Sequence, residues 1–340
     1  MAMYRIRLED RQNQKSRGVI VREILRWGER HQVTLFLASI VIGAVVGLLL
    51  PSVAHPLESI INPLLGVLLF ATFLGVPFTA IGRAFSDWRF LATVLVLNFV
   101  VVPVVVFGLS RPVAADQAIL VGVLLVLLTP CVDYVIIFTG LAGGDRSRLL
   151  AATPLLMLLQ IALLPVFLTL FAGVEAVSAF DPLPFVEAFV LLIVLPLGLA
   201  ALTQVLAARL PLAQAVEREA PAAMVPLMML TLAAVVASQI SGVGDALTRL
   251  LLTVPLFVAF AAIIAPLGAL LARTARLDLP GRRAATFSGV TRNSLVVLPL
   301  ALALPVEFAL TPLVVVTQTM VELLVMVAMV AVVPRLIRAG

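Results

Sequence analysis

The sequence predicts an all-α membrane protein with ten transmembrane helices, and three observations lead to this prediction. Of the 340 residues, 62% are hydrophobic and only 12% are charged, whereas about 25% are charged in soluble domains. Apolar runs of about 20 residues, long enough to cross the hydrocarbon core of a bilayer, recur along the chain. Basic residues collect in alternate loops, as topology signals do. We therefore expect the lipid bilayer as a partner and, despite the net charge of +5, no nucleic acid.

Residues 1–31 precede the first apolar run and form a basic N-terminal segment. The first 17 residues are polar and are expected to be a mobile tail. Residues 18–30 place apolar side chains among arginines, which predicts a helix lying on the cytoplasmic membrane surface; a solvated linker is the alternative. The segment is too long and too charged for a cleavable signal peptide, so we expect it in the mature protein.

Residues 32–340 form the predicted helical domain of ten spans. The spans are 32–51, 58–80, 88–110, 114–142, 146–172, 185–208, 218–240, 248–272, 282–304 and 308–333. Loops on one side hold Arg83, Arg89, Arg146, Arg148, Arg209, Arg218, Arg273, Arg276, Arg282 and Arg283, whereas loops on the other side hold only Arg111 and Arg249. The positive-inside rule then predicts a cell (inner) membrane protein with both termini in the cytoplasm.

The two halves of the domain carry prolines and polar residues at matching positions, which predicts an internal repeat. Five spans per half is an odd number, so the two repeats must be inverted relative to each other. The matched pairs are Pro51 with Pro211, Pro63 with Pro226, Pro103 with Pro266, Thr129 with Thr291, and Gln160 with Glu322, at offsets of 160 to 163 positions.

The fourth span contains the segment Thr129-Pro130-Cys131-Val132-Asp133. A proline at mid-span removes a backbone donor and interrupts the helix. Thr129 is a suitable N-cap for a second half-helix, and Pro130 suits its first position. Asp133 would lie in the first turn, where the helix dipole favours negative charge. We therefore predict that span four is broken.

The ninth span contains Thr291-Arg292-Asn293-Ser294 at the matching position, where Thr291 is the expected N-cap of a second half-helix. Two such half-helices build a midplane binding site in many secondary transporters. Asp133 and Arg292 are each costly in hydrocarbon, so we expect them to form a buried pair where the two broken helices cross. The alternative is that this pair only locks two helices together.

Other polar residues lie inside the spans. Gln160 and Glu322 are candidates for lining the same cavity, and Asn62 and Asn98 are expected to bond between helices. The candidate substrate- or ion-binding residues are Thr129, Cys131, Asp133, Gln160, Arg292, Asn293, Ser294 and Glu322. With one cysteine and two histidines, we expect no cofactor and no resident metal, and the chain lacks the motifs that would indicate an intramembrane enzyme.

The run from Thr129 to Phe138, followed by Leu141, Gly144-Asp145 and Gln160, resembles the arsenite efflux permeases of the bile acid/sodium symporter superfamily. Those permeases carry a Pro-Cys in the fourth helix and a Gln in the fifth. The resemblance implies ten helices in two inverted five-helix repeats, with helices four and nine broken and crossing. It also implies a panel domain of spans 1, 2, 6 and 7 and a core domain of spans 3–5 and 8–10.

The chain departs from the superfamily in span nine. Sodium-coupled members carry acidic and amide residues that bind sodium there, whereas this chain has no carboxylate in that segment and places a fixed cation, Arg292. We therefore do not expect sodium coupling. Asp133, beside the Pro-Cys, is the candidate to replace the missing carboxylate.

The sequence therefore predicts a secondary active transporter and not an enzyme. The resemblance favours proton-coupled efflux of arsenite or antimonite, with Cys131 in contact with the thiophilic centre and protons as the coupling ion. The alternative is a carrier of an organic anion, because Arg292 and two positive helix ends favour negative charge. A membrane sensor or scaffold is disfavoured, because the chain has no soluble domain.

Overall fold

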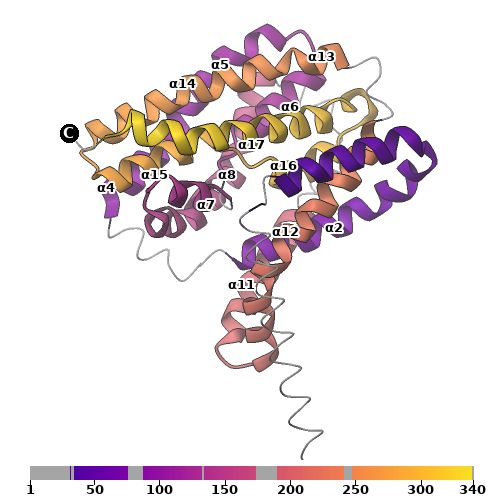
Figure 1. Ribbon diagram of the computed structural model, residues 1–340, viewed down its shortest axis with the longest axis horizontal. Helices are drawn as coiled ribbons and strands as arrows, with labels where there is room; N and C mark the ends of the chain where they lie inside the picture. Colours follow the sequence, from indigo (N-terminus) through magenta and orange to yellow (C-terminus); the bar gives the residue numbers. More distant parts are fainter. Residues whose placement is uncertain are drawn as a thin grey trace, which may run out of the picture.

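The computed structural model describes residues 31, 34–75, 87–131, 134–173, 190–240 and 247–338, and these residues form helices and no strand (Figure 1). The all-α prediction is confirmed for this part of the chain. The N-terminal tail and the interfacial helix predicted over 18–30 lie outside the described residues.

Each predicted span of the first half has a helical counterpart among the described residues. In chain order they are a helix over Thr34–Leu49, η1 (Pro51–Val53), α2 (Ala54–Leu74), α4 (Trp88–Val96), the π-helical turn η4 (Leu97–Val101), α5 (Val102–Ser110), η5 (Arg111–Val113), α6 (Gln117–Leu127), α7 (Tyr134–Leu141) and α8 (Arg146–Ala172). The bounds of α8 equal those predicted, because Asp145 caps its first turn and Gly173 ends it with a φ of 92°.

The second half follows the same order. Its elements are η6 (Val190–Val194), α11 (Leu195–Ala207), α12 (Pro211–Gln239), α13 (Leu247–Leu251), α14 (Thr253–Thr274), α15 (Leu279–Val290), α16 (Ser294–Leu302), η8 (Val306–Phe308) and α17 (Thr311–Leu336). The predicted start of span six, residues 185–189, lies outside the described residues.

Four stretches within the described residues are long and apolar enough to cross a bilayer by themselves: Trp88–Val113, Arg146–Ala172, Leu247–Thr274 and Val306–Leu336. α12 makes a fifth if its parts Pro211–Ala220 and Ala222–Ser238, bent by 56°, are one span. Pro221 lies at this bend and supplies no backbone donor there. These stretches support a membrane protein, while ten spans and the inverted repeat stay predictions.

α2, α11 and α12 pack on one another and form a group at the lower side of Figure 1. The helix over Thr34–Leu49 joins this group through Gly43 and Gly47, which lie against the backbone of Ala233 and Ala237 in α12. A Cβ on either glycine would overlap a carbonyl oxygen of α12. Small residues thus let the two helices approach closely, as in many membrane helix pairs.

The remaining helices form a second group above the first (Figure 1). α14 packs on α5, α15 and α17, and α17 also packs on α6 and α16. α8 packs on α6, α7 and α15. This group holds the segments that the resemblance assigns to the core, and the first group holds those of the panel; the functional division itself stays a prediction.

Candidate functional site

Both predicted helix interruptions are present. α6 ends at Leu127 and α7 begins at Tyr134, while α15 ends at Val290 and α16 begins at Ser294. Pro130 supplies no N–H for a continuous helical ladder, which accounts for the first interruption. The second occurs without a proline: the N–H groups of Arg292 and Asn293 and the carbonyl of Thr291 find hydrogen-bond partners outside α15 and α16.

The two interruptions meet in an isolated antiparallel bridge between Pro130 and Arg292. This pair is the non-hydrogen-bonded kind, so it accommodates a proline. Two backbone hydrogen bonds flank it: the N–H of Cys131 donates to the carbonyl oxygen of Thr291 (3.1 Å), and the N–H of Asn293 donates to that of Thr129 (2.8 Å). The two helix interruptions thus supply hydrogen-bond partners for some of each other's backbone groups in the buried interior.

The flanking threonines act alike. The hydroxyl of Thr129 donates to the carbonyl oxygen of Leu125 (2.8 Å), and that of Thr291 donates to Phe287 (2.7 Å). Each threonine therefore bonds back to the last turn of the half-helix that precedes it. The corresponding residues of the two interruptions stand 162 positions apart, as the matched threonines did in the sequence.

The predicted N-cap of the second half-helix in span nine is wrong. Thr291 is the C-cap residue of α15, and Asn293 caps α16 by accepting a hydrogen bond from the N–H of Val296 at 3.3 Å. The interruption extends to residue 293, so the capping residue nearest to α16 takes this role. In span four, Thr129 bonds to α6, and the residues directly before α7 lie outside the described part.

Arg292 is fully buried, with 0% of its surface exposed. Its guanidinium lies 5.4 Å from the ring centroid of Phe260, a cation–π distance. It donates to the carbonyl oxygens of Leu127 (3.2 Å), Ser288 (2.8 Å) and Gly289, and to Oδ1 of Asn98 (2.8 Å). The three carbonyls belong to the last turns of α6 and α15, which are the negative ends of those helices. The guanidinium therefore neutralises two converging helix ends.

Asn98 lies in the π-helical turn η4 and is also fully buried. Its amide nitrogen donates to the hydroxyl of Ser288 in α15 at 3.0 Å. The prediction that Asn98 bonds between helices is confirmed, and its bond to Arg292 makes it part of the crossing. The side chain of Asn62, for which the same was predicted, lies outside the described residues.

Side chains of α17 form hydrogen bonds with residues at the second interruption. A carboxylate oxygen of Glu322 accepts a hydrogen bond from the backbone N–H of Arg292 at 2.9 Å, and the other oxygen accepts from the amide of Gln318. The hydroxyl of Thr319 donates to that of Ser294 at 2.7 Å. Two successive turns of α17 thus supply polar partners to the crossing.

Three buried amide side chains carry an atom that has no hydrogen-bond partner within the described residues. These atoms are Nδ2 of Asn293, Oε1 of Gln318 and Oε1 of Gln160. A buried polar atom left unpaired costs about 1–3 kcal/mol, so such atoms in a native protein indicate a missing ligand or water. Asn293 and Gln318 lie at the crossing, where Cys131 is also fully buried.

The structure brings most of the predicted site residues together. Thr129, Cys131, Arg292, Asn293, Ser294 and Glu322 contribute to the crossing through the hydrogen bonds given above. Asp133 lies outside the described residues, so its pairing with Arg292 stays a prediction. Gln160 is buried in α8, and no hydrogen bond of the described part joins it to the crossing.

Sequence reasoning missed Ser288 and Phe260 as partners of the crossing. Ser288 precedes the interruption by one helical turn, and its spacing from Arg292 could have indicated it. Phe260 is one of 18 phenylalanines in an apolar chain, and nothing in the sequence distinguishes it.

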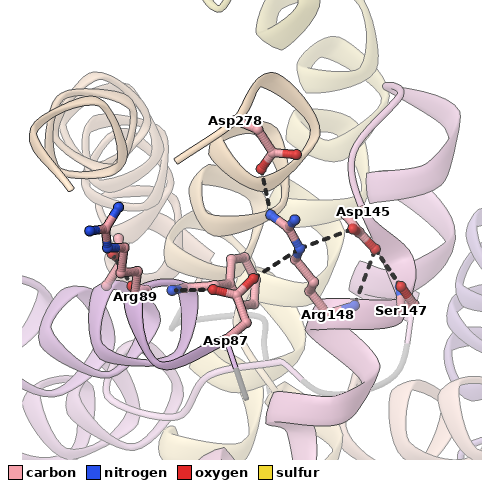
Figure 2. Close-up of polar contacts among 8 residues, drawn as sticks. Asp87, Arg89, Asp145, Ser147, Arg148 and Asp278 are labelled. Atoms are coloured by element: carbon pink, nitrogen blue, oxygen red, sulfur yellow. Dashed lines mark hydrogen bonds and ion pairs between the residues drawn. The ribbon is translucent and has the colours of Figure 1, made fainter. Parts of the chain in front are cut away.

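A second polar cluster lies where three helices of the same group begin (Figure 2). Arg148, in the first turn of α8, forms ion pairs with Asp87 (3.0 Å), Asp145 (3.2 Å) and Asp278. The three aspartates stand at the starts of α4, α8 and α15. Partial burial raises the pKa of Asp145, but hydrogen bonds from Ser147 and the N–H of Arg148, with the charge of Arg148, outweigh it and hold the pKa below its ordinary value.

Interrupted helices that meet deep within a helical membrane protein are found in many secondary transporters. Residues 62–246, more than half of the chain, match the sodium bile acid symporter family, and the protein belongs to that family. Members of this family are membrane transporters. No curated protein matches the chain. The closer likeness to arsenite permeases stays a prediction.

Proposed function

We propose that this protein is a secondary active transporter whose substrate site is the crossing of α6–α7 with α15–α16. The observation that carries the proposal is the bridge between Pro130 and Arg292, which places freed backbone groups, a thiol and unpartnered amides together. In this proposal the chain spans the inner membrane ten times as two inverted repeats, with both termini in the cytoplasm. The panel and core domains move relative to each other to expose the site on alternate sides.

The proposed substrate is a trivalent oxyacid of arsenic or antimony, which the carrier exports. Cys131 supplies a soft sulfur ligand for the thiophilic centre. The amide nitrogen of Asn293 and the hydroxyl oxygens of Thr129 and Ser294 supply hydrogen bonds to the hydroxyl groups of the oxyacid. An uncharged trihydroxide fits a fully buried site better than an anion does, because burying an ion carries a larger desolvation penalty.

Protons are the proposed coupling ion, with Asp133 gaining and losing the proton. Sodium coupling is disfavoured by the partners of Arg292. In transporters with broken helices, half-helix C-terminal ends and unwound carbonyls coordinate the coupling cation. Here the guanidinium occupies such oxygens, from Leu127, Ser288 and Gly289, and it is covalently attached to the chain.

The alternative substrate is an organic anion, which the positive charge of Arg292 would attract. The hydrogen bonds of Arg292 weaken this alternative, because both terminal nitrogens donate to acceptors of the protein itself. Thermal unfolding of the purified protein separates the two candidates. Arsenite, and not a bile acid or a short carboxylate, is expected to raise the unfolding temperature; the reverse result would favour the anion carrier.

The decisive test is arsenite resistance and transport. Expression in an arsenite-sensitive strain should restore growth, and everted vesicles should accumulate arsenite when a pH gradient is imposed. Cys131→Ser keeps the size of the side chain and removes the soft ligand, so transport should fall at least tenfold. Asp133→Asn should abolish the dependence on the pH gradient, whereas Asp145→Asn, at the end of the helix group, should leave it intact. Full resistance in Cys131→Ser would remove the thiol from the mechanism.

Replacing sodium with choline in the same vesicles tests the coupling ion. Transport by the wild-type protein should be equal in the two salts. Transport that requires sodium would show that Arg292 has not replaced the coupling cation.

A further inference from the structure

The two interruptions correspond to each other residue by residue, and the elements around them do so too. α6 begins at Gln117 and α15 at Leu279, which are 162 positions apart. The same offset relates the two bridging residues, the two back-bonded threonines and the two flanking backbone hydrogen bonds. α8 packs on α6, α7 and α15, and α17 packs on α15, α16 and α6. The surroundings of each interruption are therefore locally alike.

This correspondence pairs Gln160 of α8 with Glu322 of α17. Glu322 uses one carboxylate oxygen to accept the N–H of the bridging residue Arg292. The bridging residue opposite Gln160 would be Pro130, which has no N–H to donate. Oε1 of Gln160 is indeed unpartnered, although only 2% of the residue is exposed. If Gln160 faces Pro130 as Glu322 faces Arg292, one half of the crossing satisfies its own acceptor and the other half leaves its acceptor without a donor.

We propose that Oε1 of Gln160 is a substrate-binding acceptor at the Pro130 half of the crossing, where it takes a hydrogen bond from a hydroxyl group of the substrate. The missing N–H of Pro130 keeps this acceptor available. Its ligand is a donor of hydrogen bonds, such as the undissociated hydroxyl of an oxyacid, and not a carboxylate, which offers acceptors only. Cys131 follows Pro130 directly, so one substrate can reach both residues.

The inference rests on the proposed function for the identity of its ligand, but the position of Gln160 can be tested without any ligand. Pro130→Ala restores an N–H at the bridge. If Gln160 faces this position, the new N–H donates a hydrogen bond to its Oε1, as the N–H of Arg292 does to Glu322 in the other half. The substitution should then stabilise the protein and weaken substrate binding at the same time.

A double-mutant cycle of Pro130→Ala and Gln160→Met measures this contact. We expect Pro130→Ala to raise the unfolding temperature of the detergent-purified protein when Gln160 is present. In the Gln160→Met background the same substitution should have no such effect, because Met has a similar size but no amide. Pro299→Ala in α16 is the control, because it removes a proline of the second half without adding an N–H at the bridge. An effect of Pro130→Ala that is the same in both backgrounds would overturn the inference.

Titration with arsenite tests the ligand role. Gln160→Met and Pro130→Ala should each weaken arsenite binding about tenfold, which is the worth of one neutral hydrogen bond. Coupling in the cycle together with unchanged arsenite affinity would mean that only a structural water occupies the acceptor, and it would overturn the binding role. Wild-type protein that binds no arsenite would refute the proposed function, and the cycle would then still decide the position of Gln160.

Discussion

Arg292 and Arg148 lie in the same group of helices, yet they are stabilised in different ways. Arg292 is fully buried, and the described acceptors of its guanidinium are uncharged oxygens of the backbone and of Asn98. The side chain of Arg148 is 31% exposed and gathers three carboxylates at the starts of three helices (Figure 2). The described acceptors of the first guanidinium are carbonyl oxygens at helix ends and an amide oxygen, and those of the second are carboxylates.

Burial accounts for the difference. A carboxylate at a buried site carries a large desolvation penalty unless it is hydrogen-bonded, as Glu322 is, whereas a backbone carbonyl at a helix end is already buried and needs a donor. At a partly exposed site, water screens the charges, so carboxylates gather at little cost and each pair contributes little. The comparison predicts that equivalent substitutions at the two arginines have very different effects.

The largest effect is expected for Arg292→Leu. This substitution leaves buried acceptors at the ends of α6 and α15 without donors and should lower the free energy of unfolding by about 3–5 kcal/mol. Arg148→Leu should cost less, because each of its three partly exposed ion pairs contributes only about 0.2–1 kcal/mol. Thermal unfolding of both variants in detergent measures the contrast. Equal losses would show that burial does not separate the two clusters.

Glu322→Leu is expected to have the next largest effect. It leaves the N–H of Arg292 and the amide of Gln318 without their acceptor, which should cost about 1–3 kcal/mol. The matched control is Glu307→Leu in η8, where the glutamate is exposed and the change should be close to zero. A loss in Glu322→Leu no larger than in the control would mean that the bond between α17 and the bridge contributes little.

Salt should affect only the Arg148 cluster. The Debye length falls from about 30 Å at 0.01 M to about 3 Å at 1 M ionic strength, and exposed pairs are screened accordingly. The stability difference between wild type and Arg148→Gln should therefore shrink in 1 M choline chloride, while the difference between wild type and Arg292→Lys stays constant. The measurement is the unfolding temperature of each protein at both salt concentrations.

The smallest effect is the pH dependence contributed by Asp145. The pKa of this carboxyl in the folded protein is below its ordinary value of 3.8. The ionised form is thus favoured by folding, so its contribution is present above the ordinary pKa and is lost as the pH falls through the folded pKa. Asp145→Asn keeps an N-cap and should flatten the fall in stability below about pH 4.

The sequence was sufficient to predict both interruptions, because a mid-span proline and a run of polar residues both disfavour a continuous helix within a membrane. It was also sufficient to place the two interruptions opposite each other. The N-cap in span nine was predicted wrongly, because Thr291, Asn293 and Ser294 are all capping residues and only the length of the interruption decides among them.

The carbonyl partners of Arg292 and the aspartate partners of Arg148 could not be predicted, for a different reason. Every residue has a backbone carbonyl oxygen, so nothing in the sequence distinguishes the ones that Arg292 binds. The three aspartates around Arg148 come from positions 87, 145 and 278, and only the packing of α4, α8 and α15 brings them together. Both clusters depend on tertiary geometry.

The bridge between Pro130 and Arg292 has one more consequence, which concerns the energies of the two transport states. In a carrier built from two inverted repeats, alternating access is largely a movement of one repeat against the other around the binding site. Two chemically equal halves would make these states equal in energy. A proline on one side and a charged, hydrogen-bonded residue on the other remove that equality. If the protein is the inverted-repeat carrier proposed above, this difference gives it a preferred resting orientation even when no substrate is bound.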